Sequence, residues 1–363
     1  MKVALILPSR KLEKAISSYA MEITKSIKNQ GLNIENVFYE AGSVKSFFKI
    51  IPRLNHDVIH LFHEYNLLGN FGLPFFLIYP ILFLKKGALV TTMSTVLSQK
   101  EKFKGSFLKN FLRKYLYFFQ NRLINWTSDS VIVTMKSHKD ILVNEYGFDQ
   151  DKIKIFTSGG PTEFKVTEKE KAKKELKLSG DVYLIIGNLV PDHGIHLILK
   201  QAKKIKGTIL IVGNLSPIND RNEQRIQDYL KYLKNYVKEN NIKNVRFDIL
   251  NITDENPLWY KYFSASDIVL QAYRKNIGSG IFLHCVATKT PIVANDTEFF
   301  REIKKKFDCL NLVKDGDYAK VIKKVMKPNN YKKMIKGCEN YLKENSWDKL
   351  GKRYKELYEF LMI

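Results

Sequence analysis

Residues 182–213 read VYLIIGNLVPDHGIHLILKQAKKIKGTILIVG, and this stretch decides the fold class. Two short apolar runs, VYLIIG and TILIVG, enclose a segment whose apolar residues have helical spacing. A continuous apolar run is typical of a strand buried on both faces, and strand-helix-strand units build parallel sheets. The stretch therefore predicts one such unit of an α/β fold.

The same alternation continues in both directions along the 363 residues. The runs that predict further strands are KVALILP, DVIHLFH, GALVTTM and SVIVTM before this stretch, and VRFDIL, DIVLQAY and PIVAND after it. The chain is long enough for two domains of about 150 to 200 residues each. We expect two Rossmann-like, doubly wound parallel-sheet domains that face a central cleft.

The domain boundary is expected where the composition changes. Residues 157–176, TSGGPTEFKVTEKEKAKKEL, pass from glycines and proline to a highly charged helical segment, and a new strand follows. We therefore expect one domain over residues 1–162 and a second over 163–340. Residues 341–363 form a closing segment, in which Ser346 is a plausible N-cap for a helix with apolar residues at helical spacing. These are Trp347, Leu350, Tyr354, Leu357 and Leu361.

The charge balance favours anionic partners. Sixty Lys and Arg against 37 Asp and Glu give a formal charge of +23. Such a surface suits phosphorylated ligands, acidic lipid headgroups or nucleic acid, whereas many of the lysines could simply solvate helix faces. Nucleic acid rests on charge alone, and we do not expect it as a partner. The three cysteines, Cys285, Cys309 and Cys338, have no metal-like spacing, which favours a reducing cytoplasm.

Two segments raise the question of a membrane surface. Residues 71–84, FGLPFFLIYPILFL, are too short for a normal membrane span and indicate either a buried helix or partial immersion in a membrane interface. Residues 103–123, FKGSFLKNFLRKYLYFFQNRL, form a basic amphipathic pattern. That pattern suits either a core helix with a solvated face or a helix on an anionic membrane. We expect a cytoplasmic protein, peripheral on the inner face of the membrane.

The order of five segments carries a family resemblance. These segments are DVIHLFHEY, SVIVTMKSHKDILVNEYGFDQDKIKIFTSGGP, IIGNLVPDHGIHLILKQAKKIKGTILIVG, LWYKYFSASDIVLQAYRKNIGSGIFLHCVATKTPIVANDTEFFREI and SWDKLGKRYKELYEFL. Together they resemble the GT-B glycosyltransferases, in particular the retaining family four, glycosyl transferases group 1. The resemblance implies a nucleotide-sugar donor on the second domain, an acceptor on the first, and a closing helix that packs on the first domain. It also implies transfer with retention by the acceptor hydroxyl, without metal or cofactor, and identifies no catalytic residue.

The resemblance also implies a set of donor-binding positions. Asn188 and His193 stand where the family has the arginine and lysine that clamp the diphosphate, and Asn276 and His284 stand where it has paired glutamates. The glycine-serine-glycine turn before an apolar helix either offers backbone N–H groups to a phosphate or forms a tight corner. Its residues are Gly278, Ser279 and Gly280. His193 is either a turn histidine or a ligand contact, and His284 either a core histidine or a donor contact.

Other positions could contact phosphate or acceptor. Ser9 and Arg10 replace the family's glycine pair, and Ser94 stands near the place of its common histidine in the first domain. The remaining candidates are His63, Arg274 and Lys275. His60 and His63 lie three apart on a strand, so they should point to opposite faces and hold no metal.

The function implied is glycosyl transfer from a nucleotide-sugar to a glycan or a lipid-linked acceptor. The alternative is a catalytically silent GT-B protein that binds a glycan, a lipid or a partner enzyme, because the family's arginine, lysine and glutamates are all replaced. Aromatic or aliphatic side chains filling the space beside Gly278 to Gly280 would favour the silent protein.

Overall fold

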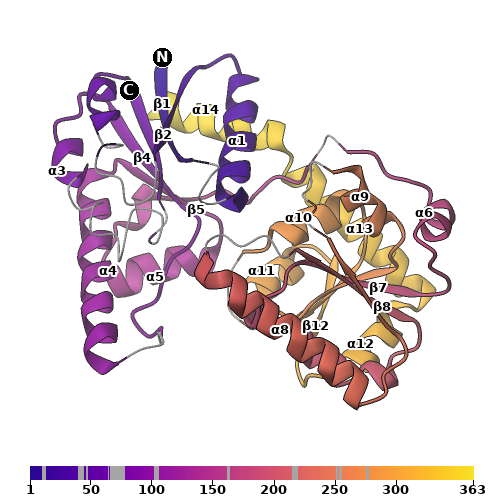
Figure 1. Ribbon diagram of the computed structural model, residues 1–363. Coiled ribbons are helices and arrows are strands. Elements are labelled where there is room, and N and C mark those ends of the chain that lie inside the picture. The colour runs from indigo at the N-terminus through magenta and orange to yellow at the C-terminus, as the bar shows by residue number, and fades with distance from the viewer. Residues whose placement is uncertain are drawn as a thin grey trace. The chain divides into compact units, whose positions relative to one another are not determined.

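The computed structural model describes residues 1–9, 14–39, 45, 48–63, 65, 78–101, 106–161, 164–214, 220–250, 252, 256–274 and 278–363. They form two compact units, of which unit 1 comprises Met1–Ser158 with Ser346–Ile363 and unit 2 comprises Gly159–Asn345. Each unit contains a six-stranded sheet in which every pair of neighbouring strands is parallel (Figure 1). The predicted α/β class with two doubly wound parallel sheets is confirmed.

Unit 1 has the strand order β2-β1-β3-β4-β5-β6. The strands are β1 (Lys2–Pro8), β2 (Asn33–Tyr39), β3 (Val58–His63), β4 (Ala88–Met93), β5 (Ser130–Val133) and β6 (Ile153–Ile155). The helices are α1 (Lys14–Lys28), α3 (Ile78–Leu82), α4 (Phe107–Thr127), α5 (Lys136–Tyr146) and α14 (Trp347–Phe360), with short 3-10 turns η1 (Ile51–Arg53) and η3 (Gln150–Lys152). Helices α1 and α14 share one apolar core with the sheet, and α3, α4 and α5 share the core on the other side.

The closing helix α14 packs against α1 within unit 1. Ser346 caps it by accepting a hydrogen bond from the Lys349 backbone, as the sequence predicts. A Cβ at Gly351 would lie 2.3 Å from the carbonyl oxygen of Ser26, so glycine allows the two helices to approach closely. His60 also holds α14 in place, because its Nδ1 lies 2.5 Å from the hydroxyl of Tyr358.

Unit 2 has the strand order β12-β11-β10-β7-β8-β9. The strands are β7 (Val182–Asn188), β8 (Thr208–Asn214), β9 (Val245–Ile249), β10 (Ile268–Gln271), β11 (Ile292–Asn295) and β12 (Leu310–Val313). The helices are α6 (Lys169–Glu175), α7 (Ile195–Leu199), α8 (Asp220–Glu239), α9 (Pro257–Ser264), α10 (Gly280–Ala287), α11 (Glu298–Lys306), α12 (Tyr318–Val325) and α13 (Pro328–Glu344), with 3-10 turns η4 (Pro191–His193) and η5 (Ala202–Lys204). Residues of α7, α8 and α12 share one apolar core with this sheet.

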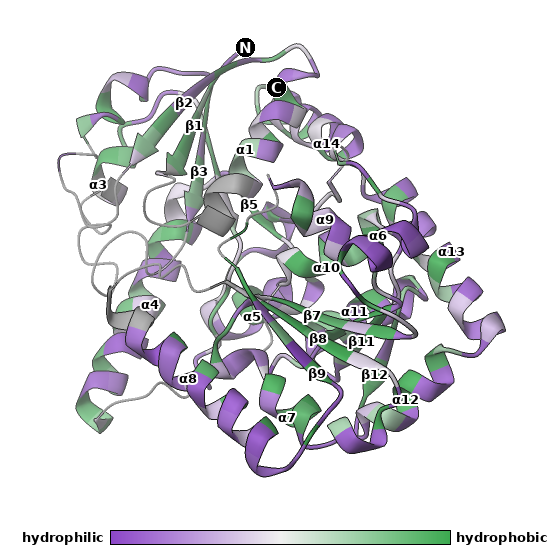
Figure 2. Ribbon diagram, turned by 45° about the vertical axis from the view of Figure 1, so that its right-hand side comes forward, coloured by the Kyte–Doolittle hydropathy of each residue, from purple (hydrophilic) through white to green (hydrophobic). Residues whose placement is uncertain are grey.

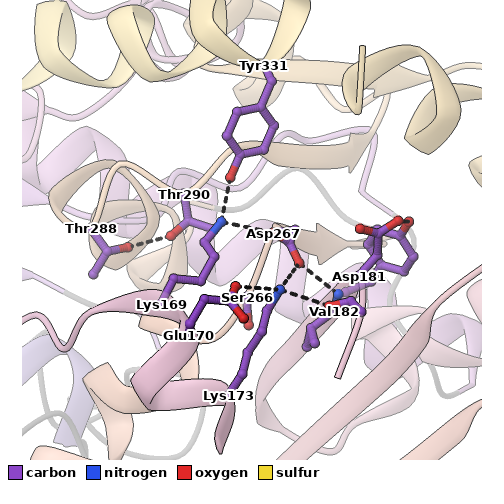
Figure 3. Close-up of polar contacts among 12 residues, drawn as sticks. Lys169, Glu170, Lys173, Asp181, Val182, Ser266, Asp267, Thr288, Thr290 and Tyr331 are labelled. Carbon is purple, nitrogen blue, oxygen red and sulfur yellow. Dashed lines mark hydrogen bonds and ion pairs between the residues drawn. The ribbon is translucent and has the colours of Figure 1, made fainter. Parts of the chain in front are cut away.

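A group of ionic hydrogen bonds fastens α6 to the amino ends of β7 and β10 (Figure 3). Asp267 accepts hydrogen bonds from Lys169 Nζ at 2.9 Å, Lys173 Nζ at 3.1 Å and the Val182 backbone at 2.9 Å. Burial alone would raise the pKa of Asp267, but the hydrogen bond from Lys169 and those from Val182 and Lys173 bring it below its ordinary value. The cluster therefore supports the sheet at the end opposite to the strand ends where ligands bind.

The unit boundaries differ by a few residues from the expected ones. Gly160 belongs to unit 2, where its backbone lies close to Leu342. A Cβ at Gly160 would lie 2.6 Å from the side chain of Leu342. Tyr341 stays with unit 2 because its ring contacts those of Phe282 and Phe307. The chain therefore returns to unit 1 only at Ser346.

The apolar segment 71–84 is only partly among the described residues, which begin again at 78. Tyr79 and Leu82 of α3 are fully buried in the core of unit 1, whereas Phe83 and Leu84 are exposed. The described part of this segment thus contains a short buried helix.

Candidate functional site

The chain reverses its direction of growth across the sheet of unit 2 between β7 and β10. From β7 the chain adds β8 and β9 on one side, and then β10, β11 and β12 on the other. Ligands of open parallel sheets bind beyond the carboxyl ends of the strands at such a reversal. A cavity of about 10 Å³, room for roughly one water molecule, lies at this place.

Four polar side chains line this cavity. Asn188 ends β7, His193 ends the η4 turn, and Gln271 ends β10, with Tyr273 two residues beyond it. The ring centroids of His193 and Tyr273 lie 4.7 Å apart. The structure therefore brings the predicted residues Asn188 and His193 together with two residues that the sequence reasoning missed. Both missed residues belong to the run DIVLQAY, and their position at its carboxyl end was the available signal.

Gly194 allows the loop after β7 to lie against the end of β10. Its φ is +67°, and a Cβ there would lie 2.0 Å from the carbonyl oxygen of Ala272. Both the left-handed backbone and the close approach require glycine. The backbone of Arg274 in turn donates a hydrogen bond to the carbonyl of Asp192 at 2.9 Å. The two loops that border the cavity are thus fixed to each other.

Ser279 connects the start of α10 to the cavity. Its hydroxyl accepts a hydrogen bond from the Phe282 backbone at 3.1 Å, which makes it the N-cap of α10. The same hydroxyl donates to Gln271 Oε1 at 2.8 Å and lies 3.3 Å from the hydroxyl of Tyr273. Ser279 therefore orients two residues of the cavity wall and is itself buried.

The two glycines beside Ser279 adjoin open space. A Cβ added at Gly278 or at Gly280 would meet no atom of the described residues within 4 Å, and neither residue is among the glycines of positive φ. Neither the backbone conformation nor crowding therefore explains these glycines as a tight corner. The first N–H groups of an α-helix have no partner inside the helix, and the helix dipole adds positive potential there. As far as the described residues extend, the amino end of α10 is thus open to an anion.

The surroundings of the His193 imidazole disfavour its charged form. Burial lowers the pKa of His193, although a hydrogen bond to the Asn188 backbone and the charge of Asp192 act in the opposite direction. Arg274 is exposed. The pKa of His196 is lowered first by burial of its ring and then by the positive charge of Arg274. Arg274 is therefore a cation close to the loop that carries His193.

His284 faces a different neighbourhood. It lies on α10, half-buried, with its Nδ1 3.1 Å from the hydroxyl of Tyr260. Its ring also contacts Trp259 and Phe263, at centroid distances of 5.6 and 5.8 Å. His284 is not among the residues that line the cavity. These contacts with α9 are the ones expected if His284 is a core histidine and not a donor contact.

In unit 1 the strand order reverses between β1 and β3, and three predicted residues follow or end strands at the same edge. Ser9 follows β1, His63 ends β3 and Ser94 follows β4. The Ser9 hydroxyl oxygen is buried without a hydrogen-bond partner in the described part of the chain. Burial lowers the pKa of His63 to about 3, so its ring is neutral. The three predicted residues at the carboxyl ends of these strands therefore carry uncharged polar groups.

The two histidines of β3 lie on opposite faces, as the sequence predicts. His60 bonds with Thr92 and Tyr358 on the side of α14, and His63 contacts the ring of Tyr65 in the other core. Among the described residues, no group of three or more His, Cys, Asp or Glu could hold a metal ion. In the same part of the chain, no helix is long and apolar enough to cross a membrane. Arg10, Lys275 and Asn276 lie outside the described residues.

The sequence matches a known family over most of unit 2. Residues 166–344 match the family described as glycosyl transferases group 1. Among curated proteins, none matches the sequence. The predicted resemblance to this family is confirmed over these residues.

Solved structures resemble the chain over its whole length. Sucrose-phosphate synthase from Thermosynechococcus elongatus has a TM-score of 0.77 at 14% identity, with 99% of both chains covered. HepE from Anabaena, in complex with UDP, has a TM-score of 0.74 at 14% identity, covering 99% of this chain and 100% of that one. A glycosyltransferase from Rickettsia africae has a TM-score of 0.72 at 15% identity, covering 99% and 98%. The chain has the GT-B fold of these proteins.

Proposed function

Because the chain has the GT-B fold and residues 166–344 match glycosyl transferases group 1, we propose that it transfers a sugar from a nucleotide-sugar donor to an acceptor hydroxyl. The observation that carries this proposal is the open amino end of α10 beside the polar cavity of unit 2. A diphosphate requires N–H donors and positive potential, and both are available at this helix end.

The donor site that we propose has three parts. The backbone N–H groups at Gly278 to Gly280 donate hydrogen bonds to the diphosphate, His193 lies beside it, and Arg274 supplies a permanent charge from the adjoining loop. Preorganised donors of this kind stabilise the negative charge that develops on a leaving diphosphate. The UDP in the Anabaena HepE structure makes a uridine diphosphate sugar the first donor to test.

The replacement of the family's clamp residues is compatible with this proposal. A diphosphate next to His193 would favour the protonated imidazole and raise the pKa that burial lowers in the free protein. His193 would then take up a proton when the donor binds. Asn188 can donate a hydrogen bond but carries no charge. The site would therefore bind its donor with fewer permanent cations than the family clamp.

We propose that unit 1 holds the acceptor near Ser9, His63 and Ser94, and that the acceptor is a glycan or a lipid-linked saccharide. Transfer proceeds with retention, the acceptor hydroxyl is the nucleophile, and neither metal nor cofactor takes part. We place the protein in the cytoplasm, peripherally on the inner face of the membrane.

The alternative proposal is a catalytically silent protein that binds a glycan, a lipid or a partner enzyme. Its support is the replacement of the clamp residues by Asn188 and His193. The space beside Gly278 and Gly280 is not filled by side chains of the described residues, and this favours a bound ligand over a silent, closed site.

Donor binding separates the two proposals. Isothermal titration and thermal unfolding should be measured with UDP-, GDP- and ADP-linked sugars at a range of concentrations. A donor present at 100 times its dissociation constant stabilises the fold by about 2.7 kcal/mol, which is a measurable rise in the unfolding temperature. If no donor binds and none raises that temperature, the sugar-transfer proposal fails and the silent protein is favoured.

A further inference from the structure

Helix α4 has most of its apolar side chains on a face that points away from the core of unit 1, whereas Tyr117 and Ile124 belong to that core. Its buried residues are Tyr117, Gln120, Asn121, Ile124 and Thr127. Three of these five are polar, and all five lie in the second half of the helix. The first ten residues, 107–116, include no buried residue. In Figure 1 the corresponding half of α4 extends past α5.

The exposed apolar residues lie on one side of the helix, where Arg122 interrupts them in the second half. At about 100° per residue they fall within an arc of about 140°, on the side opposite the buried residues. Phe107 is 87% exposed, Phe111 58% and Tyr115 62%. We define the apolar stripe as Phe107, Leu108, Phe111, Leu112, Tyr115, Phe118, Phe119 and Trp126, all of which are exposed. Figure 2 shows hydrophobic and hydrophilic residues alternating along α4.

The charges on α4 are all positive. Its 21 residues include Lys109, Arg113, Lys114 and Arg122 and no acidic residue. On a helical projection Lys114 and Lys109 lie on the two sides of the apolar stripe. Arg122 lies within the stripe, over the ring of Trp126, and Arg113 lies on the side of the buried residues. A basic helix with an aromatic, exposed face is typical of helices that lie in the surface of an anionic membrane.

The charge also decides between possible occupants. A second copy of the chain on this face would bring two helices with four positive charges each into contact, and like charges repel. An anionic bilayer supplies both opposite charge and an apolar layer. Tyr115 and Trp126 combine an apolar ring with a polar group, which suits the boundary between headgroups and acyl chains.

We propose that the apolar stripe of α4 lies in the surface of an anionic membrane. Because the core of unit 1 holds the opposite face of α4, the helix lies in the plane of the membrane. Its 21 residues span about 31 Å. The inference assigns a surface to the peripheral association proposed above, and it holds for a silent protein as well as for an active transferase.

Vesicle sedimentation without nucleotide tests the proposal. Vesicles of phosphatidylcholine with about 30% phosphatidylglycerol should bind the protein, whereas vesicles of phosphatidylcholine alone should bind it weakly. The combined variant Phe107→Gln, Phe111→Gln and Tyr115→Gln should weaken binding to the anionic vesicles by about tenfold or more. Its matched control removes three exposed apolar side chains elsewhere and should bind as the wild type does. These are Val166→Gln, Tyr232→Gln and Phe360→Gln.

A second pair of variants tests the charge. Lys109→Gln, Arg113→Gln and Lys114→Gln together should weaken binding to anionic vesicles by about 100-fold and leave binding to neutral vesicles unchanged. The control neutralises three exposed lysines of α12 and should have a much smaller effect. These are Lys320→Gln, Lys323→Gln and Lys324→Gln.

Tryptophan fluorescence reports the orientation of α4. The chain has three tryptophans, of which Trp126 is 55% exposed and Trp259 and Trp347 are buried. Vesicle binding should therefore shift the emission to shorter wavelength through Trp126, and Trp126→Phe should abolish the shift. Brominated lipids should quench the same emission.

Several results would overturn the proposal. One is sedimentation of the stripe variant equal to that of the wild type, and another is vesicle binding without any change at Trp126. A wild-type dimer in light scattering that the stripe variant abolishes, without vesicle binding, would assign the stripe to a second copy. Circular dichroism checks that the variants are folded. If the stripe variant is unfolded, the sedimentation of the charge variant and the fluorescence of Trp126 test the proposal instead. Vesicle binding without donor binding would exclude the sugar-transfer proposal and leave the membrane proposal intact.

Discussion

Replacing Gly280 by valine separates a phosphate site from a structural turn. Gly280 has no positive φ, and its added Cβ would meet no atom within 4 Å in the described part of the chain, so the fold should accept valine. We expect the free energy of unfolding to change by less than about 1 kcal/mol, which is about 2–4 °C in the unfolding temperature. The valine side chain would, however, occupy the space next to the N–H groups at the start of α10.

The loss in binding can be estimated from one hydrogen bond. A hydrogen bond between a backbone N–H and a charged phosphate contributes about 1.5–3 kcal/mol. Its loss should therefore raise the dissociation constant of a nucleotide-sugar by about 10–100-fold. Gly280→Ala, which adds one carbon in place of three, should give a smaller effect. Isothermal titration and thermal unfolding of the same preparations measure both quantities.

Two results would refute this reasoning. A dissociation constant within about threefold of the wild-type value would show that no phosphate contacts the start of α10. A fall of more than about 5 °C in the unfolding temperature of the free protein would show that the fold requires glycine there. In the second case, the tight-corner alternative would be right.

Three further predictions concern the cavity and the closing helix. Ser279→Ala removes the N-cap of α10 and the donor to the buried Gln271, and should cost about 2–4 kcal/mol in a urea unfolding experiment. Gly351→Ala brings a Cβ to 2.3 Å from the Ser26 carbonyl and should cost about 1–3 kcal/mol, with unfolding of unit 1 at lower urea as the readout. Donor affinity should rise as the pH falls from about 8 to about 6, because His193 starts with a lowered pKa and gains a proton beside the diphosphate. His193→Gln should abolish this pH dependence in titrations, and an unchanged slope would remove His193 from the site.

The strands missing from the sequence prediction share one property. The apolar runs predict nine strands, and the structure adds β2, β6 and β12. β2, β6 and β12 lie at the edges of their sheets. An edge strand is covered less completely than a central one, and in β2 only two of seven residues are buried. Such a strand has no continuous apolar run, so the signal that identifies central strands is absent.

The sequence predicts the place of the candidate site better than it predicts which residues form it. The rule that ligands bind beyond the carboxyl ends of strands applies to sequence alone, and it selects Asn188 at the end of β7. The same rule selects Gln271 and Tyr273, which the family comparison does not emphasise. The hydrogen bond from Ser279 to Gln271 joins residues eight apart through the fold, and no periodicity encodes that contact.

The apolar pattern of α4 shows why one sequence signal permits two structures. An amphipathic pattern shows that a helix has an apolar and a polar face, but it does not show which of the two faces packs against the core. In α4 the apolar core residues Tyr117 and Ile124 share the buried face with three polar residues, which a hydrophobicity pattern assigns to solvent. These are Gln120, Asn121 and Thr127. Only the tertiary packing shows that the aromatic face is the exposed one.

The exchange of a lysine for His193 has a consequence for catalysis under the proposed function. A permanent cation attracts the diphosphate of the bound donor and the departing diphosphate alike, so part of its effect is uniform binding. Burial disfavours the charged form of His193 in the free protein, and the diphosphate of a bound donor favours it. Breaking the sugar–phosphate bond adds further negative charge to the diphosphate, so the attraction of the protonated imidazole strengthens toward the transition state. His193→Gln should therefore lower kcat as well as raise KM.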